Sequence, residues 1–380
     1  MAEKAKTSRR DFLKGHAAVE ALGDAIIGPP PKLPPPQAIR PSSSHLLTVS
    51  REAMACLFEI VFDAAKYRHL TETAIEALDL VAALEQQLTV YRDSSEVGEI
   101  NRRASAEPVE VEEGLFELLV RAVEISSATG GAVDVTAGPL SKAWGFYRRQ
   151  GRMPEAAEIT AALTLVGSEN LLLEPDRRTI QFAKAGMELN LGAVGKGYAI
   201  DKAAAHLISA GIDSFLIHGG TSSVLAKGAR VDDLRWEIEE SDKSQIPNPK
   251  SNIPAGWSVG LKHPLKPDLR LAEFVLRDQA LGTSGSGTQF FHHQGKRLGH
   301  ILDPRTGWPA DKVLSATVIA PTAEQADALS TALYVLGLEA AHEFCASRPE
   351  IGALLVTVGE RAGSVELFPI NLAEDAWRRL

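Results

Sequence analysis

Short apolar runs that suit β-strands cluster along the chain instead of alternating one by one with helices. Regular alternation would favour a doubly wound parallel sheet, whereas clustered strands favour packed layers of sheet and helix. The runs cover Phe215–Ile217, Ser223–Lys227, Trp257–Leu261, Phe274–Leu276, Leu314–Ile319 and Gly352–Val358. We therefore predict an α+β fold with mixed β-sheets and packed helices.

Apolar residues also recur every three to four positions, which is the period of an α-helix with one buried face. The segments with this period are Thr71–Thr89, Glu113–Ser127, Gly197–Ala210 and Ala323–Leu336. A further apolar run, Ala53–Phe62, precedes the first helix and is predicted to be one buried strand.

Composition limits the possible partners of the chain. Of its 380 residues, 44% are hydrophobic, which is enough for a large core. The net charge of −9 argues against nucleic acid, because phosphate binding needs clustered Lys and Arg. No apolar run approaches the roughly 20 residues that span a bilayer, so no transmembrane segment is expected. The two cysteines, Cys56 and Cys345, are too few for a disulfide framework and are predicted to be buried thiols.

The N-terminal segment differs in composition from the rest of the chain. Its proline runs predict an extended tail or linker that builds no core. Within it, residues 8–14 (Ser-Arg-Arg-Asp-Phe-Leu-Lys) resemble a twin-arginine export signal, although Glu20 and Asp24 interrupt the apolar stretch that should follow. We expect an exported, periplasmic protein, with a basic tail on a cytoplasmic protein as the alternative. The predicted parts are a tail at 1–45 and a folded domain at 46–380, with a polar surface insertion around 229–256.

A glycine-rich turn with one lysine, Asn190–Tyr198, leads straight into the third predicted helix. Its glycines let the backbone approach a ligand closely, and a helix N-terminus offers N–H groups to phosphate. Lys196 adds a full positive charge. The turn is not a Walker A loop, because Asn190 stands where that motif has glycine and Gly197 where it has Ser or Thr. A simple strand-to-helix turn remains the alternative.

Asp327 and Thr331 lie four residues apart on the last predicted helix, so both side chains share one face. The rest of that helix is almost wholly apolar, and a carboxylate in such a setting is costly without a partner. Carboxylate and hydroxyl oxygens suit a hard cation such as magnesium. The alternative is that Asp327 caps the helix and Thr331 hydrogen-bonds to its own turn.

Two further segments combine turn residues with reactive or polar side chains. His300–Pro309 presents an imidazole, a carboxylate and a guanidinium in one punctuated loop, and a histidine of near-neutral pKa can serve as a general base. Gly282–Thr288 is predicted to be a hydroxyl-rich glycine loop that could cradle phosphate. His292 and His293 would point to opposite faces of a strand, which argues against a shared metal site.

Together and in this order, these segments resemble the ApbE-type flavin transferase family, whose members are FAD:protein FMN transferases. The resemblance extends from about Met54 to about Gly337 and implies an ApbE-like, T-fold-like architecture. It is carried by Met54, Tyr91, Ser95-Glu96, Asn101, Ala132–Asp134, Trp144–Phe146, Leu191–Asp201, Gly219-Gly220, Thr283–Gly285, His300–Pro309 and Ala326–Leu333. The His300 loop followed by the Asp327 helix is the most specific part.

The resemblance also implies a role for each site residue. FAD, as the substrate, would contact Met54, Tyr91, Ala132, Val133, Asp134, Asn190, Lys196 and Ile301. Magnesium would be held by Asp327, Thr331 and the backbone carbonyl of Ala193. His300 would be the catalytic base that deprotonates the acceptor hydroxyl. The acceptor would be a Ser or Thr of a flavin-carrying redox partner, and AMP would be released.

Several segments depart from the usual pattern of the family, among them His218 before the Gly219-Gly220 pair and a longer polar insertion around 229–256. Asn190 stands where Asp is usual, and Thr283–Gly285 is not followed by the usual aromatic and acidic residues. Three functions therefore stay open: an FAD:protein FMN transferase, an FAD pyrophosphatase that makes FMN and AMP, and a flavin-binding protein without activity. We expect the transferase, since the predicted metal, lysine and histidine residues are all present.

Overall fold

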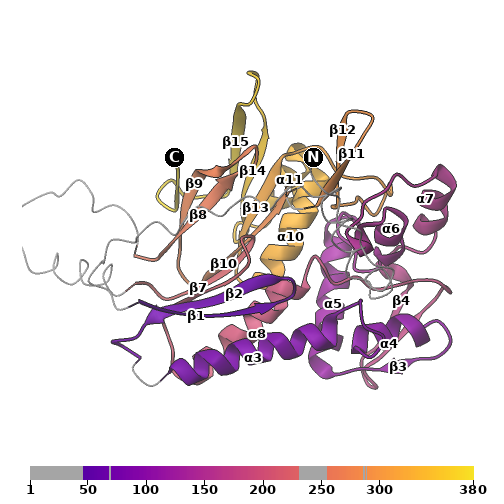
Figure 1. Ribbon diagram of the computed structural model, residues 1–380, viewed down its shortest axis with the longest axis horizontal. Coiled ribbons are helices and arrows are strands. Elements are labelled where there is room, and N and C mark those ends of the chain that lie inside the picture. The colour runs from indigo at the N-terminus through magenta and orange to yellow at the C-terminus, as the bar shows by residue number, and fades with distance from the viewer. Residues whose placement is uncertain (1–45, 68–69, 231–254, 286, 288) are drawn as a thin grey trace, which may run out of the picture. The chain divides into compact units, whose positions relative to one another are not determined.

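A computed structural model describes residues 46–67, 70–230, 255–285, 287 and 289–380 (Figure 1). These residues belong to one compact unit, Ser44–Leu380. The predicted tail and most of the predicted insertion lie outside the described residues. Within the described part of the chain, no helix is long and apolar enough to cross a membrane.

The centre of the fold is an eight-stranded sheet in which each strand runs antiparallel to its neighbours. In spatial order its strands are β1 (Leu46–Ala53), β2 (Cys56–Asp63), β6 (Phe215–Gly219), β7 (Ser223–Lys227), β10 (Gln279–Gly285), β13 (Ser315–Ala320), β14 (Gly352–Val358) and β15 (Val365–Ile370). The predicted α+β class is confirmed, and the pairings refine its mixed sheets to antiparallel ones.

The central strands of this sheet are buried on both faces. All six residues of β13 are buried, and successive side chains of a strand point to opposite faces. Val318 accordingly packs into a core shared with the helices, whereas Ile319 packs into a second core. That second core is closed by a three-stranded sheet of β16 (Trp377–Arg379), β9 (Lys266–Leu276) and β8 (Trp257–His263). Two-sided burial explains why these strands read as continuous apolar runs.

Three helices cover the other face of the sheet. They are α3 (Thr71–Leu88), α8 (Gly195–Ser209) and α10 (Ala323–Leu336). α3 packs on β1 and α8, and α10 packs on α8, β10 and β13. In Figure 1, α3 and α8 run beneath β1 and β2, and α10 stands against the central strands.

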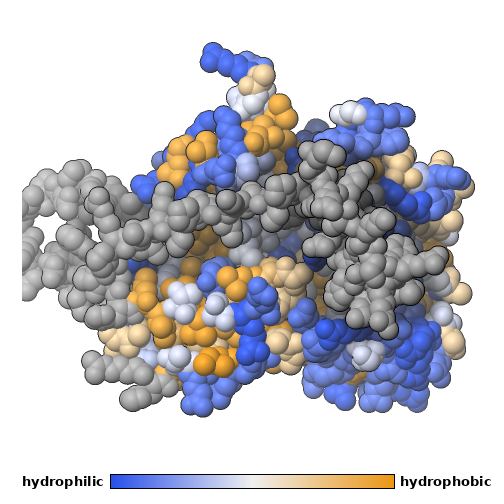
Figure 2. All heavy atoms as spheres, in the orientation of Figure 1, coloured by the Kyte–Doolittle hydropathy of each residue, from blue (hydrophilic) through white to orange (hydrophobic). Residues whose placement is uncertain are grey.

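A second group of elements surrounds α5 (Glu113–Ala128), which also contacts α10. The group comprises α4 (Glu96–Arg103), α6 (Gly138–Ala143), α7 (Ala156–Leu163), the 3-10 helices η1 (Phe146–Arg148) and η2 (Ser168–Asn170), and the strands β3 (Val109–Glu110), β4 (Leu171–Glu174) and β5 (Thr179–Phe182). The remaining elements are the hairpin β11 (Phe290–His293) and β12 (Lys296–Gly299), and α11 (Leu338–Ala346). Figure 2 shows hydrophilic side chains around α4 and hydrophobic ones over the β1–β2 hairpin.

Two glycines let α10 approach its neighbours backbone to backbone. A Cβ atom on Gly197 of α8 would lie 2.1 Å from the carbonyl oxygen of Ala323. A Cβ atom on Gly282 of β10 would lie 2.4 Å from that of Ala326. Since real side chains never approach backbone so closely, only glycine permits this packing. The first turn of α10 is therefore fixed between α8 and the sheet.

The strand predicted at Ala53–Phe62 is confirmed from Cys56 onward as β2, but its start is wrong, because the chain turns at Met54 and Ala55 between β1 and β2. Ala53 ends β1 and Cys56 begins β2, and the two residues between them have positive φ angles of 49° at Met54 and 58° at Ala55. Met54 consequently lies at the hairpin turn and does not open a strand. The buried thiol predicted at Cys345 is confirmed, whereas Cys56 is half-buried.

The predicted phosphate loop at Gly282–Thr288 is wrong over its first half. Gly282–Gly285 belongs to β10 and pairs with β13. The glycines there serve strand and helix packing, because Gly282 faces the backbone of α10. The third predicted helix begins at Gly195, earlier than expected. The bounds predicted for β7, β14 and α10 are confirmed.

Candidate active site

A buried hydrogen-bond chain joins α8, β7 and α10. Asp327 lies on α10 with 7% of its surface exposed, and its Oδ1 accepts a hydrogen bond from Ser223 Oγ at 2.6 Å. Lys196 Nζ, at the start of α8, donates to Ser223 Oγ at 2.7 Å and to Ser222 Oγ at 2.5 Å. The predicted phosphate lysine and the predicted metal carboxylate are thus one serine apart.

The electrostatics of Asp327 suit a bound cation. Burial raises the pKa of its carboxyl, while the Lys196 ammonium, the Ser223 hydroxyl and the Gly197 N–H act in the opposite direction. The effect of burial is the largest of these, so the pKa is raised and the contacts only partly stabilise the ionised carboxylate. A positive ion placed beside the carboxylate would favour that ionised form.

Hydroxyl groups continue this site along α10. Thr331 Oγ1 lies 3.0 Å from Ser284 Oγ of β10, and Ser284 Oγ also lies 3.0 Å from Ser330 Oγ. Thr331 Oγ1 also donates to the carbonyl oxygen of Asp327 at 3.2 Å, so it bonds to its own turn, as the alternative interpretation expected. Asp327 does not cap the helix, because that position belongs to Thr322.

The donor set fits magnesium better than a softer metal. Asp327, Thr331 and Ser284 offer only oxygen atoms, which magnesium prefers, and magnesium commonly uses few protein ligands beside water and phosphate. No cluster of three or more His, Cys, Asp or Glu side chains that could hold a metal occurs in the described ranges. Ala193 lies in the turn before α8, where the Val194 and Gly195 N–H groups bond to Leu191. Its role as a carbonyl ligand stays a prediction.

His300 follows β12 directly and is largely enclosed. Its Nδ1 lies 3.2 Å from the carbonyl oxygen of Gln289, and its ring meets the edge of Phe146 at 6.4 Å between ring centres. A carbonyl oxygen can only accept, so Nδ1 carries the hydrogen and Nε2 carries the lone pair. Burial lowers the pKa of the imidazole, and the Gln289 contact opposes that only in part. The neutral ring required of a general base is therefore favoured.

The loop after His300 is held by its own charges and by a tryptophan. Asp303 accepts hydrogen bonds from Arg305 Nε and Nη2, both at 2.8 Å. Trp144 Nε1 donates to the carbonyl oxygen of Gly307 at 2.7 Å. Ile301 is 9% exposed, and its carbonyl oxygen accepts from the Ala310 N–H at 2.9 Å. The structure therefore brings together the His300 loop and the Trp144 segment.

The Asp134 carboxylate organises its own loop. Its Oδ1 accepts from the N–H and the hydroxyl of Thr136, and its Oδ2 accepts from Ser126 Oγ and from the N–H and hydroxyl of Ser168. Ala132 and Val133, just before it, are buried. These bonds fix the loop, and any contact of Asp134 with FAD stays a prediction.

Asn190 connects that loop to the turn before α8. Its N–H donates to the carbonyl oxygen of Val135 at 2.6 Å, and its Oδ1 accepts from the Gly192 N–H at 3.0 Å. An Asp at this position could accept the same Gly192 bond, so the local turn does not require the change to Asn.

Tyr91 and Met54 occupy more open positions. Tyr91 is 61% exposed, and its ring centre lies 4.9 Å from that of Tyr147. Tyr147 is anchored by its hydroxyl to the carbonyl oxygen of Val90 at 2.6 Å. Met54, at the β1–β2 turn, is partly buried against the helical core. An exposed aromatic ring of this kind can stack on a planar ligand, and the contact of Tyr91 with FAD stays a prediction.

The sequence did not single out three serines of the site as individual residues, although Ser284 lies within the predicted loop at Gly282–Thr288. Ser222, Ser223 and Ser284 all touch a predicted site residue. Serines in strand-like segments are common, so nothing in their spacing marked them. Ser222 and Ser223 follow the Gly219-Gly220 pair closely, and Ser284 belongs to the Thr-Ser-Gly triplet, so both motifs marked the correct segments.

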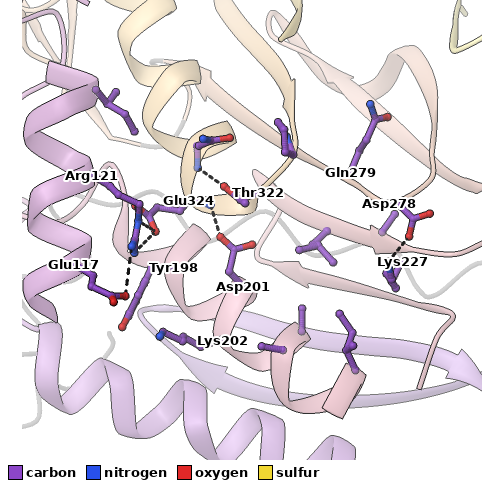
Figure 3. Close-up of a pocket in the computed structure, with 18 of the residues that line it drawn as sticks. Glu117, Arg121, Tyr198, Asp201, Lys202, Lys227, Asp278, Gln279, Thr322 and Glu324 are labelled. Carbon is purple, nitrogen blue, oxygen red and sulfur yellow. Dashed lines mark hydrogen bonds and ion pairs between the residues drawn. The ribbon is translucent and has the colours of Figure 1, made fainter. Parts of the chain in front are cut away.

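A groove of about 610 Å³ opens at the N-terminal end of α10 (Figure 3). Arg121, Tyr198, Asp201 and Glu324 line it, together with Lys227 and Asp278 from the sheet side. None of the predicted site residues lines this groove. The groove borders α8 and α10, the helices that carry Lys196 and Asp327, but it lies at a different place along them.

The sequence of this chain is similar to a family of known proteins. The ApbE family model matches residues 54–355. An FAD:protein FMN transferase of Klebsiella pneumoniae is 31% identical over 77% of this chain and 84% of its own length. One from Treponema pallidum is 31% identical over 75% of this chain and 77% of its own.

Solved structures agree with these relatives. The ApbE protein of Thermotoga maritima superposes with a TM-score of 0.71 at 28% identity, covering 84% of this chain and 96% of that chain. The flavin transferase ApbE from Vibrio cholerae, at 24% identity, gives a TM-score of 0.72 and covers 86% of this chain and 97% of that chain.

Proposed function

Because this chain belongs to the ApbE family, we propose that it is an FAD:protein FMN transferase. The reaction cleaves the pyrophosphate of FAD, joins the phosphorus of FMN to a Ser or Thr oxygen of a redox partner protein, and releases AMP. The observation that supports it best is the buried chain from Lys196 through Ser223 to Asp327. The Lys196 ammonium is suited to bind a pyrophosphate, and the buried Asp327 carboxylate is suited to bind the metal ion that accompanies it.

Asp327, Thr331 and the carbonyl oxygen of Ala193 would hold magnesium. When bound, magnesium would supply positive charge to the pyrophosphate and stabilise the charge that develops as it breaks. Lys196 would bind the same phosphates, with its ammonium oriented by Ser222 and Ser223. The N-terminus of α8, which follows the turn at once, would add backbone N–H groups.

His300 would take the proton of the acceptor hydroxyl through Nε2. Its Nδ1–H is directed at Gln289, which fixes the tautomer with the lone pair on Nε2. As the acceptor oxygen bonds to the FMN phosphorus, the bond from that phosphorus to the bridging oxygen breaks, and AMP leaves with that oxygen. Tyr91, Met54 and the Ala132–Asp134 loop would position the flavin and adenine parts.

The partner and the compartment are also proposals. The activity named for the relatives requires a protein substrate, and we propose that this acceptor is a flavin-carrying redox protein. The twin-arginine-like residues 8–14 support export to the periplasm. Fractionation of cells that express the full chain tests this, and recovery of the intact N-terminus in the cytoplasm only would contradict it.

The decisive experiment incubates the protein with FAD, magnesium and a flavin-carrier domain. We expect a covalent yellow product on the domain, with one AMP released per flavin attached. Free FMN and AMP without labelled protein would instead establish the pyrophosphatase. Binding of FAD with no AMP release would establish the flavin-binding alternative.

A further inference from the structure

The N-terminus of α10 is capped by a carboxylate from another helix. The two oxygens of Asp201, on α8, accept from the N–H groups of Ala323 at 2.8 Å and Glu324 at 2.9 Å. The hydroxyl of Thr322 accepts from the Gln325 N–H at 3.2 Å, and the first bond within the helix runs from the Ala326 N–H to the Thr322 carbonyl oxygen at 3.0 Å. The N–H groups of the first three residues of α10, which have no partner within a helix, are therefore all satisfied.

Two more contacts secure the same turn. Arg121 of α5 forms a two-pronged ion pair with Glu324, with Nε–Oε1 and Nη2–Oε2 distances of 2.9 Å each. Gly197 of α8 lies directly against the backbone of Ala323. Figure 3 shows Asp201 of α8 and Arg121 of α5 directed at the start of α10, where Arg121 meets Glu324.

The capped turn and the proposed metal site use the same pair of helices. Asp327 lies one helical turn beyond Ala323 on α10, and Lys196 precedes Asp201 on α8. Any slide or tilt between α8 and α10 would change the distance between Lys196 and Asp327. From this juxtaposition we propose that Asp201 is a positioning residue, which holds α10 so that Asp327 meets magnesium beside Lys196. The proposal rests on the proposed function for the role of Asp327.

Asp201 is placed here at an energetic cost. Burial raises the pKa of its carboxyl to about 6, with Glu324 and Asp327 adding repulsion and the two N–H groups opposing it. Exposed Asp, Ser or Thr caps achieve the same hydrogen bonding without burial. A partly buried carboxylate that links two helices also fixes their relative position, which a cap within the helix does not.

The test replaces Asp201 by Asn, which keeps the size but leaves one acceptor oxygen for two N–H groups. Asp278→Asn is the matched control, because Asp278 lines the same groove but pairs with Lys227 and makes no bond to α10. Magnesium is titrated calorimetrically into each protein with ADP present, since ADP supplies a pyrophosphate without turnover. Hydrogen exchange at the amides of Ala323 and Glu324 is measured in parallel.

We expect Asp201→Asn to weaken magnesium binding about tenfold, which corresponds to the free energy lost when one helix cap is removed. Hydrogen exchange at the Ala323 and Glu324 amides should become faster. Excess magnesium should restore transfer, and Asp278→Asn should match the wild type. Unchanged magnesium affinity in Asp201→Asn would overturn the proposal. If Asp201→Asn does not fold, Asp201→Glu takes its place, and an unchanged magnesium affinity in that variant would equally overturn the proposal.

Failure of the positioning role and failure of the proposed function give different results. A wild-type protein that flavinylates the carrier domain with magnesium, alongside an Asp201→Asn variant of unchanged magnesium affinity, refutes only the positioning role. A wild-type protein that releases no AMP from FAD with magnesium refutes the function itself.

Discussion

Asp327 combines a cost in stability with the proposed chemistry. Its carboxyl has a raised pKa in the folded protein, so folding favours the protonated form. A raised acid pKa gives stability at low pH that is lost as the pH rises through the folded pKa. Without magnesium, Asp327 therefore lowers the stability of the fold as the pH rises above the usual pKa of an aspartate. Many active sites trade stability for function in this way.

Asp327→Asn should separate the two effects. We expect transfer to fall at least about 100-fold and to lose its response to magnesium. The metal-free variant should melt about 2 °C higher than the wild type at pH 8, since the Ser223 bond is kept and the buried charge is removed. Scanning calorimetry and a magnesium titration of AMP release check both results. Asp213→Asn, which removes a surface ion pair with Lys66, serves as the control. Full activity without Asp327 would refute the metal assignment.

His300→Gly should stop the chemistry while leaving the ligand bound. The imidazole contacts Phe146 and Gln289, which are not among the residues proposed to bind FAD. We expect the Kd for FAD to change less than about threefold, with transfer lowered at least about 100-fold. Fluorescence quenching of FAD and labelling of the carrier domain measure the two quantities. Transfer at the wild-type rate would show that another group accepts the proton.

The pH dependence of transfer should reflect the lowered pKa of His300. The base form exists above the folded pKa, which lies below the usual 6.5. Transfer should therefore stay level from pH 8 down to about 6.5 and fall only at lower pH. Since the unfolded chain takes up this proton more readily, stability should also decline as the pH falls below 6.5. A pH–rate profile that drops already between pH 8 and 7 would contradict this assignment.

At the scale of elements, the position of α10 is fixed by glycines on both sides. Gly197→Ala and Gly282→Ala would each force a methyl group to within 2.5 Å of a backbone carbonyl oxygen of α10. We expect each change to cost about 2–3 kcal/mol of unfolding free energy, as overpacking against backbone does. Gly195→Ala is the control on α8, since its Cβ would meet Leu191 at an ordinary 3.9 Å. Urea titrations with unchanged midpoints for both variants would show that α10 can shift freely.

Elements with one strong periodic face were predictable, and those defined by unusual backbone were not. The bounds of α10 followed from its apolar face and the glycine after it. The β1–β2 turn was missed because Met54 and Ala55 have positive φ without glycine or asparagine. The strand at Gly282 was read as a loop because its glycines serve a close approach to α10, a reason that only the tertiary structure reveals.

The residues of the candidate site could be proposed from the sequence, but the hydrogen bonds that connect them could not. Asp327 and Lys196 were singled out from charge in apolar or glycine-rich surroundings. Their connection through Ser223 depends on β7 lying beside α8 and α10, and strand order cannot be read from local periodicity.

At the scale of the whole molecule, the described residues on either side of the polar segment around 229–256 lie close together. Trp257 Nε1 donates to the carbonyl oxygen of Lys227 at 3.0 Å, and β7 pairs directly with β10. Replacing residues 231–254 by a short Gly-Ser linker should therefore shift the Tm by less than about 2 °C. Thermal melts of the full chain and the shortened one check this. A large loss of stability would show that the segment contributes to the core.

The strand order of the large sheet also governs how the protein is made. Strand β2 hydrogen-bonds to β6, and β7 to β10, so strands made early wait for partners made much later. Until then, β2 keeps an open edge, the kind of surface that aggregates and that chaperones bind. A nascent chain holds Lys196 long before Asp327 emerges from the ribosome. The proposed phosphate and metal site therefore cannot form until α10 has been synthesised, and a chain that ended before α10 would carry the lysine turn without the Asp327 carboxylate.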